Sequence, residues 1–433
     1  MTTDTQSANN PVFERRESEA RSYCRGFPTT FAKAQGSIMT AADGTEYIDF
    51  LAGCSSLNYG HNDADMKAAL IEHITNDGIA HGLDMYTEEK AKWLEAYENI
   101  VLKPRGMDDY KVMMTGPTGT NAVEAAMKLA RKITGRRNII SFTNGFHGMT
   151  MGSLSLTGNA GKRGGAGTPL GGVTHMPYEG AMGEGVDTLA FIETMLDNGS
   201  SGVDAPAAFI FEPVQGEGGL NAASKEWIEG IAKLAKKHGA LLIVDDIQAG
   251  IGRTGKYFGF EGMDIEPDLI TQAKSLSGFG LPFACLLIKR EHDVWKPAEH
   301  NGTFRGNTHA FVTGRVALEK FWADKDAMEA STAEKSDILE KGLQKIADLV
   351  PGAYLKGRGF MRGVDVGTGE LAEDICGRAF EKGLIIETSG ADDEVVKVLA
   401  ALNIPNDVLQ KGLDIVLDAT REALNENAKY AAE

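Results

Sequence analysis

The sequence predicts an α/β protein, in which a large domain with a mostly parallel, doubly wound sheet precedes a smaller α+β domain. From about Lys111 onward, short apolar segments alternate with helical patterns, which is typical of parallel rather than antiparallel sheets. After Phe321 the pattern changes to charged helices. A chain of 433 residues is long enough for two such domains with a shared core. We expect an N-terminal segment (1–75) that packs with the small domain, a large domain (76–320) and a C-terminal small domain (321–433).

The individual elements follow from local patterns. Around the Asp43-Gly44 pair, alternating segments predict an early hairpin that packs against the small domain. Five short apolar segments predict strands of the large sheet: 111–114, 138–142, 207–211, 240–244 and 269–273. Helices are predicted over 122–132, where apolar residues recur at three- and four-residue spacing, and over 225–238, before Gly239. The C-terminal part predicts a short strand around 360–366 and a final amphipathic helix from about Asn406.

Composition excludes several classes of function. Hydrophobic content of 42% and charged content of 24% are ordinary for a soluble globular enzyme. The net charge of −17 argues against a surface for nucleic acid or anionic membrane, because both need a basic face. Residues 1–19 are polar and no run of about 18 apolar residues occurs, so we expect a cytoplasmic location. The four cysteines lie too far apart in sequence to indicate a disulfide framework or a zinc site.

Two charged residues stand where parallel strands are expected to end. Lys274 closes the predicted strand 269–273, and Asp245 follows the predicted strand 240–244. Ligands of doubly wound sheets bind outside the carboxyl ends of the strands. A lysine there is costly to bury as an ammonium, so its amine is more easily freed to form a Schiff base with an aldehyde. A neighbouring carboxylate suits a protonated ring nitrogen, and together the two residues indicate a pyridoxal phosphate site.

Simpler interpretations of the same residues remain open at this point. Lys274 could be a strand-end lysine that reaches water, and Asp245 could cap a following helix, with Asp246 as a helix-start carboxylate. The run 118–121 follows a strand and opens a helix, where backbone N–H groups could hold a phosphate or simply serve as a cap. Phe146 follows the next strand and could stack on a flat ring or belong to the core.

A competing motif is the stretch 250–256, "GIGRTGK", which has the spacing of a nucleotide phosphate loop. The motif then requires Ser or Thr for magnesium, but the next residue is Tyr257. The glycines also follow an Asp-Asp-Ile-Gln segment instead of leaving the strand directly. We therefore disfavour a nucleotide triphosphatase.

The longer string "VDDIQAGIGRTGKYFGFEGMDIEPDLITQAKSLSGFGLP" resembles the signature of class III aminotransferases, fold type I enzymes that use pyridoxal phosphate. The segments "GTEYIDFLAG", "GTNAVEAAMKLAR", "GFHGMTMGSLSLTG", "FEPVQGEGG" and "NGTFRGN" occur in the same order as in that family, so the resemblance covers nearly the whole chain. It implies a seven-stranded, mostly parallel sheet flanked by helices. It also implies a homodimer as the minimum unit, with small amine and oxoacid substrates.

The resemblance assigns roles to residues at matching positions. Lys274 would be the catalytic lysine and Asp245 the partner of the pyridine nitrogen. The remaining cofactor contacts that it implies are Gly119 and Thr120 at the phosphate, Phe146 on the ring, Gln248 at the phenolic oxygen, Glu212 near that side through Gln248, and Thr303 from the neighbouring subunit. A non-catalytic protein that keeps the fold is disfavoured because Lys274 is present.

Within the class, segments such as "GPTGTNAVEAA", "TNGFHGMTMG", "VDDIQAG" and "GLIIETSG" look most like the branch that moves the 4-amino group between L-2,4-diaminobutyrate and 2-oxoglutarate in ectoine synthesis. The alternatives are enzymes acting on ornithine, acetylornithine or 4-aminobutyrate. Those acting on ornithine or 4-aminobutyrate typically carry arginines where this chain has Met149 and Lys397, so both usual carboxylate clamps are altered. We expect carboxylate binding at Lys397 to be less orientation-specific than at arginine.

Three residues are candidates for contacts with the substrates. Arg305, in "GTFRGN", is a hypothetical replacement clamp, although it could equally form an ion pair between subunits. Glu217, in "GEGG", matches the switch carboxylate of the family. We predict that Glu217 pairs with Lys397 when no substrate carboxylate is present, the alternative being a purely structural contact. The glycine-rich stretch 162–172 is expected to form a mobile surface loop near the mouth of the site.

Overall fold

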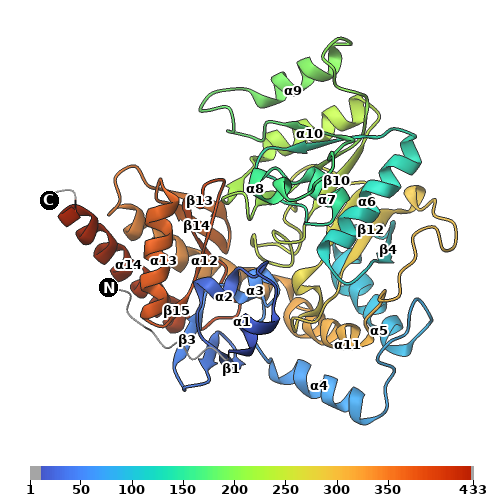
Figure 1. Cartoon of the computed structure of the whole chain (residues 1–433). Coiled ribbons are helices and arrows are strands. Elements are labelled where there is room, and N and C mark those ends of the chain that lie inside the picture. The colour runs from blue at the N-terminus through green and yellow to red at the C-terminus, as the bar shows by residue number, and fades with distance from the viewer. Residues whose placement is uncertain (1–10, 431–433) are drawn as a thin grey trace.

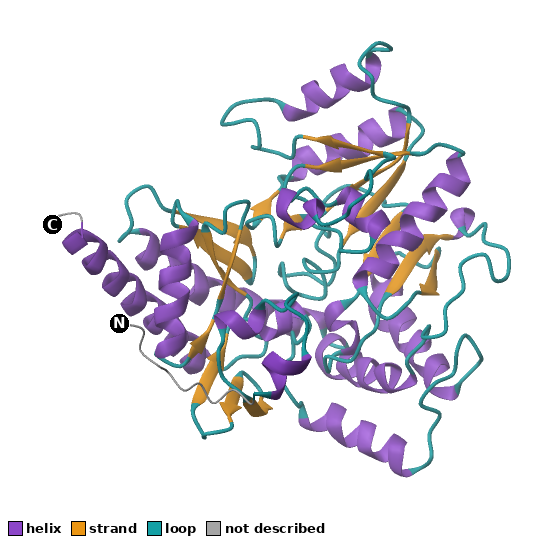
Figure 2. Ribbon diagram, viewed as in Figure 1, coloured by secondary structure: helices purple, strands orange, loops and turns teal. Residues whose placement is uncertain are grey.

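The computed structural model describes residues 11–430, with side chains described as far as residue 426. Residues 1–10 of the expected N-terminal segment and the last three residues of the expected small domain lie outside the described part. A large sheet flanked by helices is joined to a smaller sheet covered by long helices (Figure 1). Strands and helices of both parts are drawn in contrasting colours in Figure 2.

The large sheet has seven strands in the order β4-β12-β11-β10-β7-β5-β6. The strands are β4 (Tyr110–Met114), β5 (Asn138–Phe142), β6 (Val173–Met176), β7 (Pro206–Phe211), β10 (Leu241–Asp245), β11 (Leu269–Gln272) and β12 (Cys285–Lys289). All neighbouring pairs are parallel except those made by β12, which is antiparallel to β11 and to β4. The predicted mostly parallel, seven-stranded sheet is confirmed. The sequence prediction had located five of these strands and missed β6 and β12.

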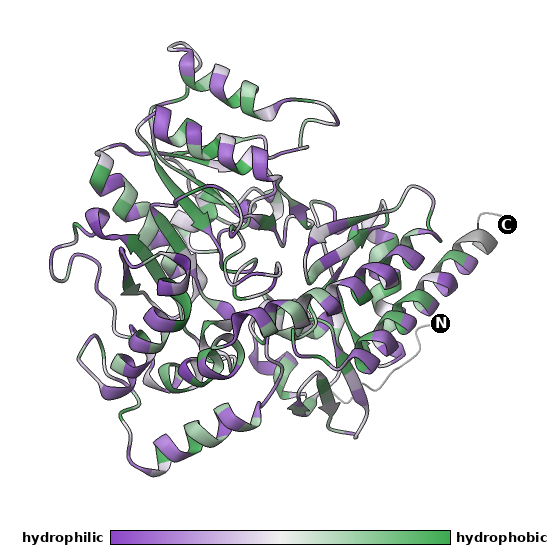
Figure 3. Ribbon diagram, turned by 180° about the vertical axis from the view of Figure 1, so that it is seen from behind, coloured by the Kyte–Doolittle hydropathy of each residue, from purple (hydrophilic) through white to green (hydrophobic). Residues whose placement is uncertain are grey.

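Each face of this sheet is covered by helices because both faces are apolar. Along β10, Leu241 and Ile243 pack with α6 (Gly119–Thr134) in one core cluster, whereas Leu242 and Val244 belong to the cluster that contains the apolar side of α10 (Lys225–Lys237). Successive strand residues point to opposite faces, which explains this division. Figure 3 shows the result, with hydrophobic strands at the centre and helices that are hydrophobic on one side only.

The small domain contains a four-stranded antiparallel sheet in the order β13-β14-β17-β16. Its strands are β13 (Tyr354–Arg358), β14 (Met361–Asp365), β16 (Glu387–Ser389) and β17 (Val395–Val398), and its helices are α12 (Lys325–Ala347), α13 (Gly369–Glu381) and α14 (Asn406–Tyr430). The predicted strand around 360–366 and the final helix from Asn406 correspond to β14 and α14.

The N-terminal strands join the small domain through hydrogen bonds. β1 (Phe31–Gln35), β2 (Ile38–Ala41) and β3 (Glu46–Asp49) form an antiparallel meander, and β3 pairs in parallel with β15 (Leu384–Ile385). The hairpin predicted at Asp43-Gly44 is the β2–β3 connection. These strands lie against the C-terminal part of the chain (Figure 1).

The remaining elements are short strands, irregular turns and further helices, of which α7 and α11 are mostly buried. They are α1 (Val12–Arg16), α2 (Tyr23–Gly26), α3 (Ala52–Ser55), α4 (Ala64–Thr75), α5 (Glu88–Ala96), α7 (Met151–Leu156), α8 (Ala160–Gly164), α9 (Thr188–Asp197), α11 (Thr308–Ala317), the two-residue strands β8 (Val214–Gln215) and β9 (Asn221–Ala222), and irregular helical turns at Tyr97–Leu102, Lys103–Arg105, Lys274–Ser277, Arg290–His292 and Leu318–Trp322. The start of the glycine-rich stretch 162–172 belongs to α8, so it is not a loop throughout. No helix in the described part of the chain is both long and apolar enough to cross a membrane.

Candidate active site

A cavity of about 510 Å³ lies at the carboxyl edge of the large sheet. This volume falls within the range of small-molecule sites. Seven residues predicted from the sequence line it: Gly119, Thr120, Phe146, Glu212, Asp245, Gln248 and Lys274. They come from the ends of different strands, and the topology of a doubly wound sheet brings such ends together.

Asp245 is the last residue of β10 and is buried. Its Oδ2 lies 2.7 Å from Nδ1 of His147, and its Oδ1 accepts a hydrogen bond of 3.0 Å from the hydroxyl of Thr271. Burial acts to lower the pKa of His147, but the hydrogen bond and charge of Asp245 outweigh it and raise that pKa. His147 therefore fixes the Asp245 carboxylate. Sequence analysis missed this role, although His147 also follows a strand end.

Lys274 lies two residues beyond β11, at the start of a short helical turn, rather than at the end of the strand as predicted. Its φ of +52° is in the left-handed region, which is uncommon for residues other than glycine and often marks a functional site. The next residue, Ser275, anchors the turn because its hydroxyl donates to the carbonyl of Ser55 (2.7 Å) and accepts from the N–H of Asn58 (2.9 Å). Burial lowers the pKa of the Lys274 amine, although Glu217 opposes this effect.

The first turn of α6 forms one end of the cavity. Thr118 caps the helix in a reciprocal arrangement with Asn121, and Gly119 and Thr120 are its first residues. The N–H groups of a first helical turn have no partners within the helix, and the positive end of the helix dipole favours an anion. A Cβ atom at Gly148 would lie 2.4 Å from the Thr120 hydroxyl oxygen, so only glycine fits beside this turn.

Phe146 and Glu212 form another part of the cavity wall. The N–H of Phe146 donates a 2.9 Å hydrogen bond to Oε2 of Glu212. The ring of Phe146 is not part of the core, and Nζ of Lys162, from α8, lies 5.6 Å from its centroid. Glu212 is buried, and desolvation raises its pKa to about 7. The amide of Gln248, through which Glu212 was expected to lie near the phenolic oxygen, donates to Glu217 (3.1 Å) and to the carbonyl of Cys54 (3.4 Å).

The predicted contact between Glu217 and Lys397 is present, since Lys397 Nζ donates to Glu217 Oε1 at 3.0 Å. Lys397 is fully buried and also lies 3.0 Å from Oε1 of Glu387, a carboxylate that sequence analysis did not single out. Burial opposes ionisation of Glu217, but Lys397 and Lys274 outweigh it and hold its pKa well below the usual range. Burial also works against the charged form of Lys397, yet the two carboxylates raise its pKa. Lys397 is thus a buried cation between two glutamates.

The structure corrects the interpretation of the region after Asp245. No helix follows, so Asp245 is not a helix cap and Asp246 is not a helix-start residue. Asp246 is buried, and its Oδ1 accepts a 2.9 Å hydrogen bond from the N–H of Gly259. The "GIGRTGK" stretch forms turns that contain the buried Arg253, which donates 2.6 Å to the carbonyl of Ala400. This stretch has no strand-to-helix phosphate loop.

Thr303 and Arg305 lie in the loop before α11 and do not line the cavity of their own chain. Arg305 is partly buried, which lowers the pKa of its guanidinium, and its Nε has no hydrogen-bond partner among the described residues. Large apolar side chains are exposed on α4, in the loop after it and at Phe304: Ile71, Ile74, Ile79, Leu83, Met85, Tyr86 and Phe304. His81 of that loop contacts Phe304 and pairs with Asn307. A surface of this kind is typical of an interface.

Comparison with known proteins agrees with this geometry. The sequence pattern of the family described as Aminotransferase class-III matches residues 21–420. A diaminobutyrate–2-oxoglutarate transaminase from Halalkalibacterium halodurans is 53% identical over 412 residues, which is 95% of this chain and 96% of that protein. A protein of the same name from Halomonas elongata is 51% identical over 419 residues, covering 96% of this chain and 99% of the relative.

Solved structures show the same fold at low sequence identity. A transaminase from the marine bacterium Virgibacillus has a TM-score of 0.85 at 20% identity, and the match covers 96% of this chain and 99% of the other. The ornithine aminotransferase from Toxoplasma gondii has a TM-score of 0.81 at 23% identity, covering 96% and 94%. The extent of the sequence match and the shared fold establish that this chain is an enzyme of the class III aminotransferase family.

Proposed function

We propose that the protein transfers the 4-amino group between L-2,4-diaminobutyrate and 2-oxoglutarate, giving L-aspartate 4-semialdehyde and L-glutamate, with pyridoxal phosphate as cofactor. The observation that carries this proposal is the buried Lys397 between Glu217 and Glu387, beside Lys274. Lys397 occupies the position at which related enzymes for ornithine or 4-aminobutyrate typically have arginine. The names of the relatives that are 51–53% identical support the same substrate pair.

The cavity residues fit the cofactor. The N–H groups at Gly119 and Thr120 suit its phosphate, and Phe146 offers an aromatic face for its ring. Asp245 suits the protonated ring nitrogen, and its carboxylate is already oriented by His147 and Thr271. When bound, pyridoxal phosphate withdraws the electron pair released as the amine-bearing carbon loses its proton.

The residues of the chain supply the proton transfers and the orientation. The Lys274 amine, with its pKa lowered by burial, would take the proton from the amine-bearing carbon of the substrate and then deliver it to the carbon of the cofactor that carries the nitrogen. Asp245 stabilises positive charge at the ring nitrogen, and His147 keeps that carboxylate from rotating. We expect replacement of Asp245 to be far more damaging than replacement of Asp246, which holds the Gly259 loop.

Glu217 and Lys397 would accommodate two kinds of substrate in one pocket. A 4-amine lacks a carboxylate on the reacting carbon, and the Glu217–Lys397 pair then remains closed. Glutamate carries such a carboxylate, and Lys397 would turn from Glu217 to pair with it. The exchange is feasible because Glu217 keeps a second partner in the Gln248 amide.

A homodimer is part of the proposal. The exposed apolar side chains of α4, of the loop after it and of Phe304 need a partner surface. Thr303 and Arg305 lie outside the cavity of their own chain. A second copy would bring Thr303 to the cofactor phosphate and Arg305 towards the substrate carboxylate. If Arg305→Ala leaves the Michaelis constants for glutamate and 2-oxoglutarate unchanged, Arg305 is not a carboxylate clamp. The cytoplasm and ectoine synthesis are the setting that we propose for this activity.

A coupled assay tests the function directly. Purified protein supplied with pyridoxal phosphate is incubated with 2-oxoglutarate and one amine at a time: diaminobutyrate, ornithine, acetylornithine or 4-aminobutyrate. We expect glutamate formation to be fastest with diaminobutyrate. Faster turnover of ornithine, acetylornithine or 4-aminobutyrate would reassign the substrate. Absence of any borohydride-fixed adduct on Lys274 would refute the cofactor assignment.

A further inference from the structure

Glu387 and Lys397 are directly opposite each other in the small-domain sheet. β16 and β17 are antiparallel, and their register pairs Glu387 with Lys397. Directly opposite residues have their Cβ atoms close together on one face of the sheet. The Lys397 ammonium reaches Glu387 on one side and Glu217, from the large domain, on the other, each at 3.0 Å.

Within ion-pair distance, this cluster has two carboxylates for one ammonium. Two carboxylates share the single Lys397 ammonium, and Glu217 takes the directed hydrogen bond. Glu387 Oε1 is buried and lies 3.0 Å from Lys397 Nζ. Its Oε2 is 4.0 Å from the Cys54 thiol, which is a long and weak contact. A carboxylate has about four acceptor positions, so Glu387 retains capacity for another donor.

Glu387 does not line the cavity itself but is linked to it through Lys397 and Glu217, which accepts a hydrogen bond from the cavity residue Gln248. Burial lowers the pKa of Lys274, and both Glu217 and Glu387 act in the opposite direction. The side chain of Glu387 is 13% exposed, so it is buried but not sealed off. Burial raises its pKa, Lys397 opposes that rise, and the nearby charge of Glu217 adds to it. An additional cation at this point would stabilise the charged form of Glu387.

The turn that carries Cys54, whose thiol contacts Glu387, has an unusual backbone. Ala52, Gly53, Cys54 and Ser55 all have positive φ angles between +44° and +73°, so this turn is left-handed. Three of the four are not glycine, and such strain persists mainly where function requires it. The turn places the Cys54 thiol towards Glu387 and 2.8 Å from the hydroxyl of Tyr23, which extends over it from α2. Two residues later, Ser56 lines the cavity.

We propose that Glu387 is a specificity residue that binds the 2-ammonium group of diaminobutyrate while the 4-amine reacts at Lys274. This inference rests on the proposed function. Diaminobutyrate differs from 4-aminobutyrate only by that second ammonium group, and an ammonium has three donors to match the open acceptor positions of Glu387. Lys397, beside Glu387, stays paired with Glu217 while the 4-amine reacts.

A purely positioning role for Glu387 makes a different prediction. If Glu387 only held Lys397 in place, its loss would affect 4-aminobutyrate and diaminobutyrate alike, because the two amines differ only in the second ammonium group. A role in binding the second ammonium affects diaminobutyrate alone. The ratio of kcat/KM for the two amines therefore separates the two roles.

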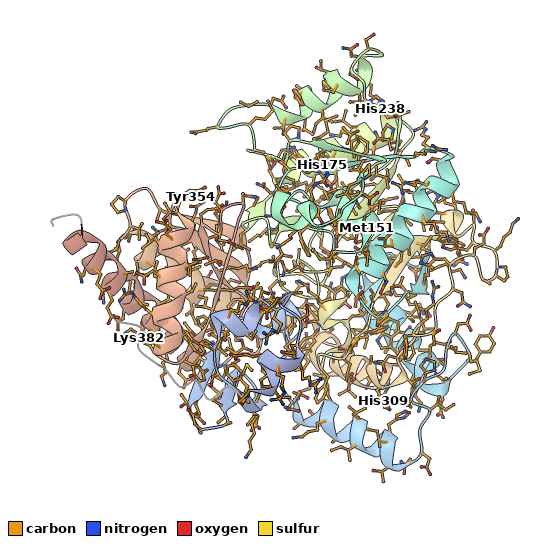
Figure 4. All side chains as sticks on the ribbon, viewed as in Figure 1. Met151, His175, His238, His309, Tyr354 and Lys382 are labelled. Atoms are coloured by element: carbon orange, nitrogen blue, oxygen red, sulfur yellow. The ribbon has the colours of Figure 1, made fainter. Side chains whose placement is uncertain are left out.

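The test compares Glu387→Gln with Glu387→Asp and a control, Glu422→Gln, in the dimeric enzyme loaded with pyridoxal phosphate. Glu422 pairs with Lys382 at 2.8 Å on the outer side of the small domain, where Lys382 is labelled in Figure 4. We expect Glu387→Gln to lower the diaminobutyrate to 4-aminobutyrate ratio by about 10-fold or more, as for loss of one charge-assisted hydrogen bond. Glu387→Asp should recover part of the ratio, and Glu422→Gln should leave it unchanged.

A binding measurement gives a second readout without turnover. In a Lys274→Ala background, titration calorimetry should show that Glu387→Gln weakens diaminobutyrate about 10-fold more than 4-aminobutyrate. Equal weakening of both amines overturns the inference, as does an unchanged ratio in the assay. If the native enzyme does not use diaminobutyrate at all, the proposed function itself fails. If it does and the Glu387→Gln ratio stays the same, only the role of Glu387 fails.

Discussion

Replacing Lys397 by methionine removes the cation that lies within ion-pair distance of both Glu217 and Glu387. Methionine is similar in length and has no charge, so among the described residues the two carboxylates then have only the charge of Lys274 nearby. Removing one partner of a buried ion pair typically costs about 3–5 kcal/mol. Glu217 is 25% exposed and Glu387 13%, which allows some solvent screening, so we expect about 3 kcal/mol near neutral pH.

The loss should depend on pH in a defined direction. In the native protein, the low pKa of Glu217 contributes stability that is present above its ordinary pKa and lost as the pH falls through its folded pKa. In Lys397→Met, burial and mutual repulsion raise the pKa values of both carboxylates. The folded variant then binds more protons than the unfolded chain, so its stability increases as the pH falls. The difference between variant and native protein should shrink from about pH 8 to about pH 5.

Thermal unfolding at the two pH values measures this difference. We expect the unfolding midpoint of Lys397→Met to fall by about 3 °C at the higher pH and by clearly less at the lower one. Lys382→Met, which disrupts the exposed pair with Glu422, is the matched control and should change little. The double variant Lys397→Met with Glu387→Gln should recover stability, because only one carboxylate remains charged. An equal loss at both pH values, or a loss no larger than in the control, would refute the reasoning.

Three further predictions follow from the cavity. His147→Phe should weaken cofactor affinity about 10-fold or more in an equilibrium titration, because Asp245 loses its 2.7 Å partner, whereas His147→Asn retains a donor and should lose less. The free energy of unfolding of the native protein, measured relative to Glu212→Gln, should fall by about 3 kcal/mol as the pH rises from about 4.5 to about 7 and should then level off. The reason is that folded Glu212 keeps its proton up to a pKa of about 7. A difference that does not change with pH would contradict this. Asp246→Asn should keep most activity and stability near pH 7, because burial raises the Asp246 pKa and the Gly259 contact needs only an acceptor, whereas Asp245→Asn should lose nearly all activity in the coupled assay.

Much of the fold was predictable because local pattern and tertiary structure agree. The strands β5, β7 and β10 are short, fully buried and separated by amphipathic helices, so their apolar segments stand out. β6 has a mixed burial pattern and follows a glycine-rich stretch, and β12 comes directly after a turn region without a helix before it. The direction of β12 depends on the whole topology and not on its own residues.

The site was predictable where its residues sit at strand ends, as for Asp245, and less so where a contact joins distant parts of the chain. His147 and Asp245 are 98 residues apart, and only the order of β5, β7 and β10 brings them together. Glu387 becomes significant only through its register opposite Lys397. Sequence pattern alone cannot supply that register, because the intervening turn could shift it by a residue.

The exchange of arginine for lysine at position 397 and the presence of Glu387 are best understood together. A guanidinium engages one carboxylate through two parallel hydrogen bonds, whereas an ammonium is a compact charge with three rotatable donors. Considered alone, Lys397 was expected to orient a carboxylate less well than arginine. In the structure, however, Glu387 and Glu217 hold its ammonium from two sides, at 3.0 Å each, in a fully buried position. The two glutamates therefore fix the position of the Lys397 ammonium, whereas the planar shape of arginine fixes its own hydrogen-bond directions. The same arrangement places the second carboxylate, Glu387, next to Lys397.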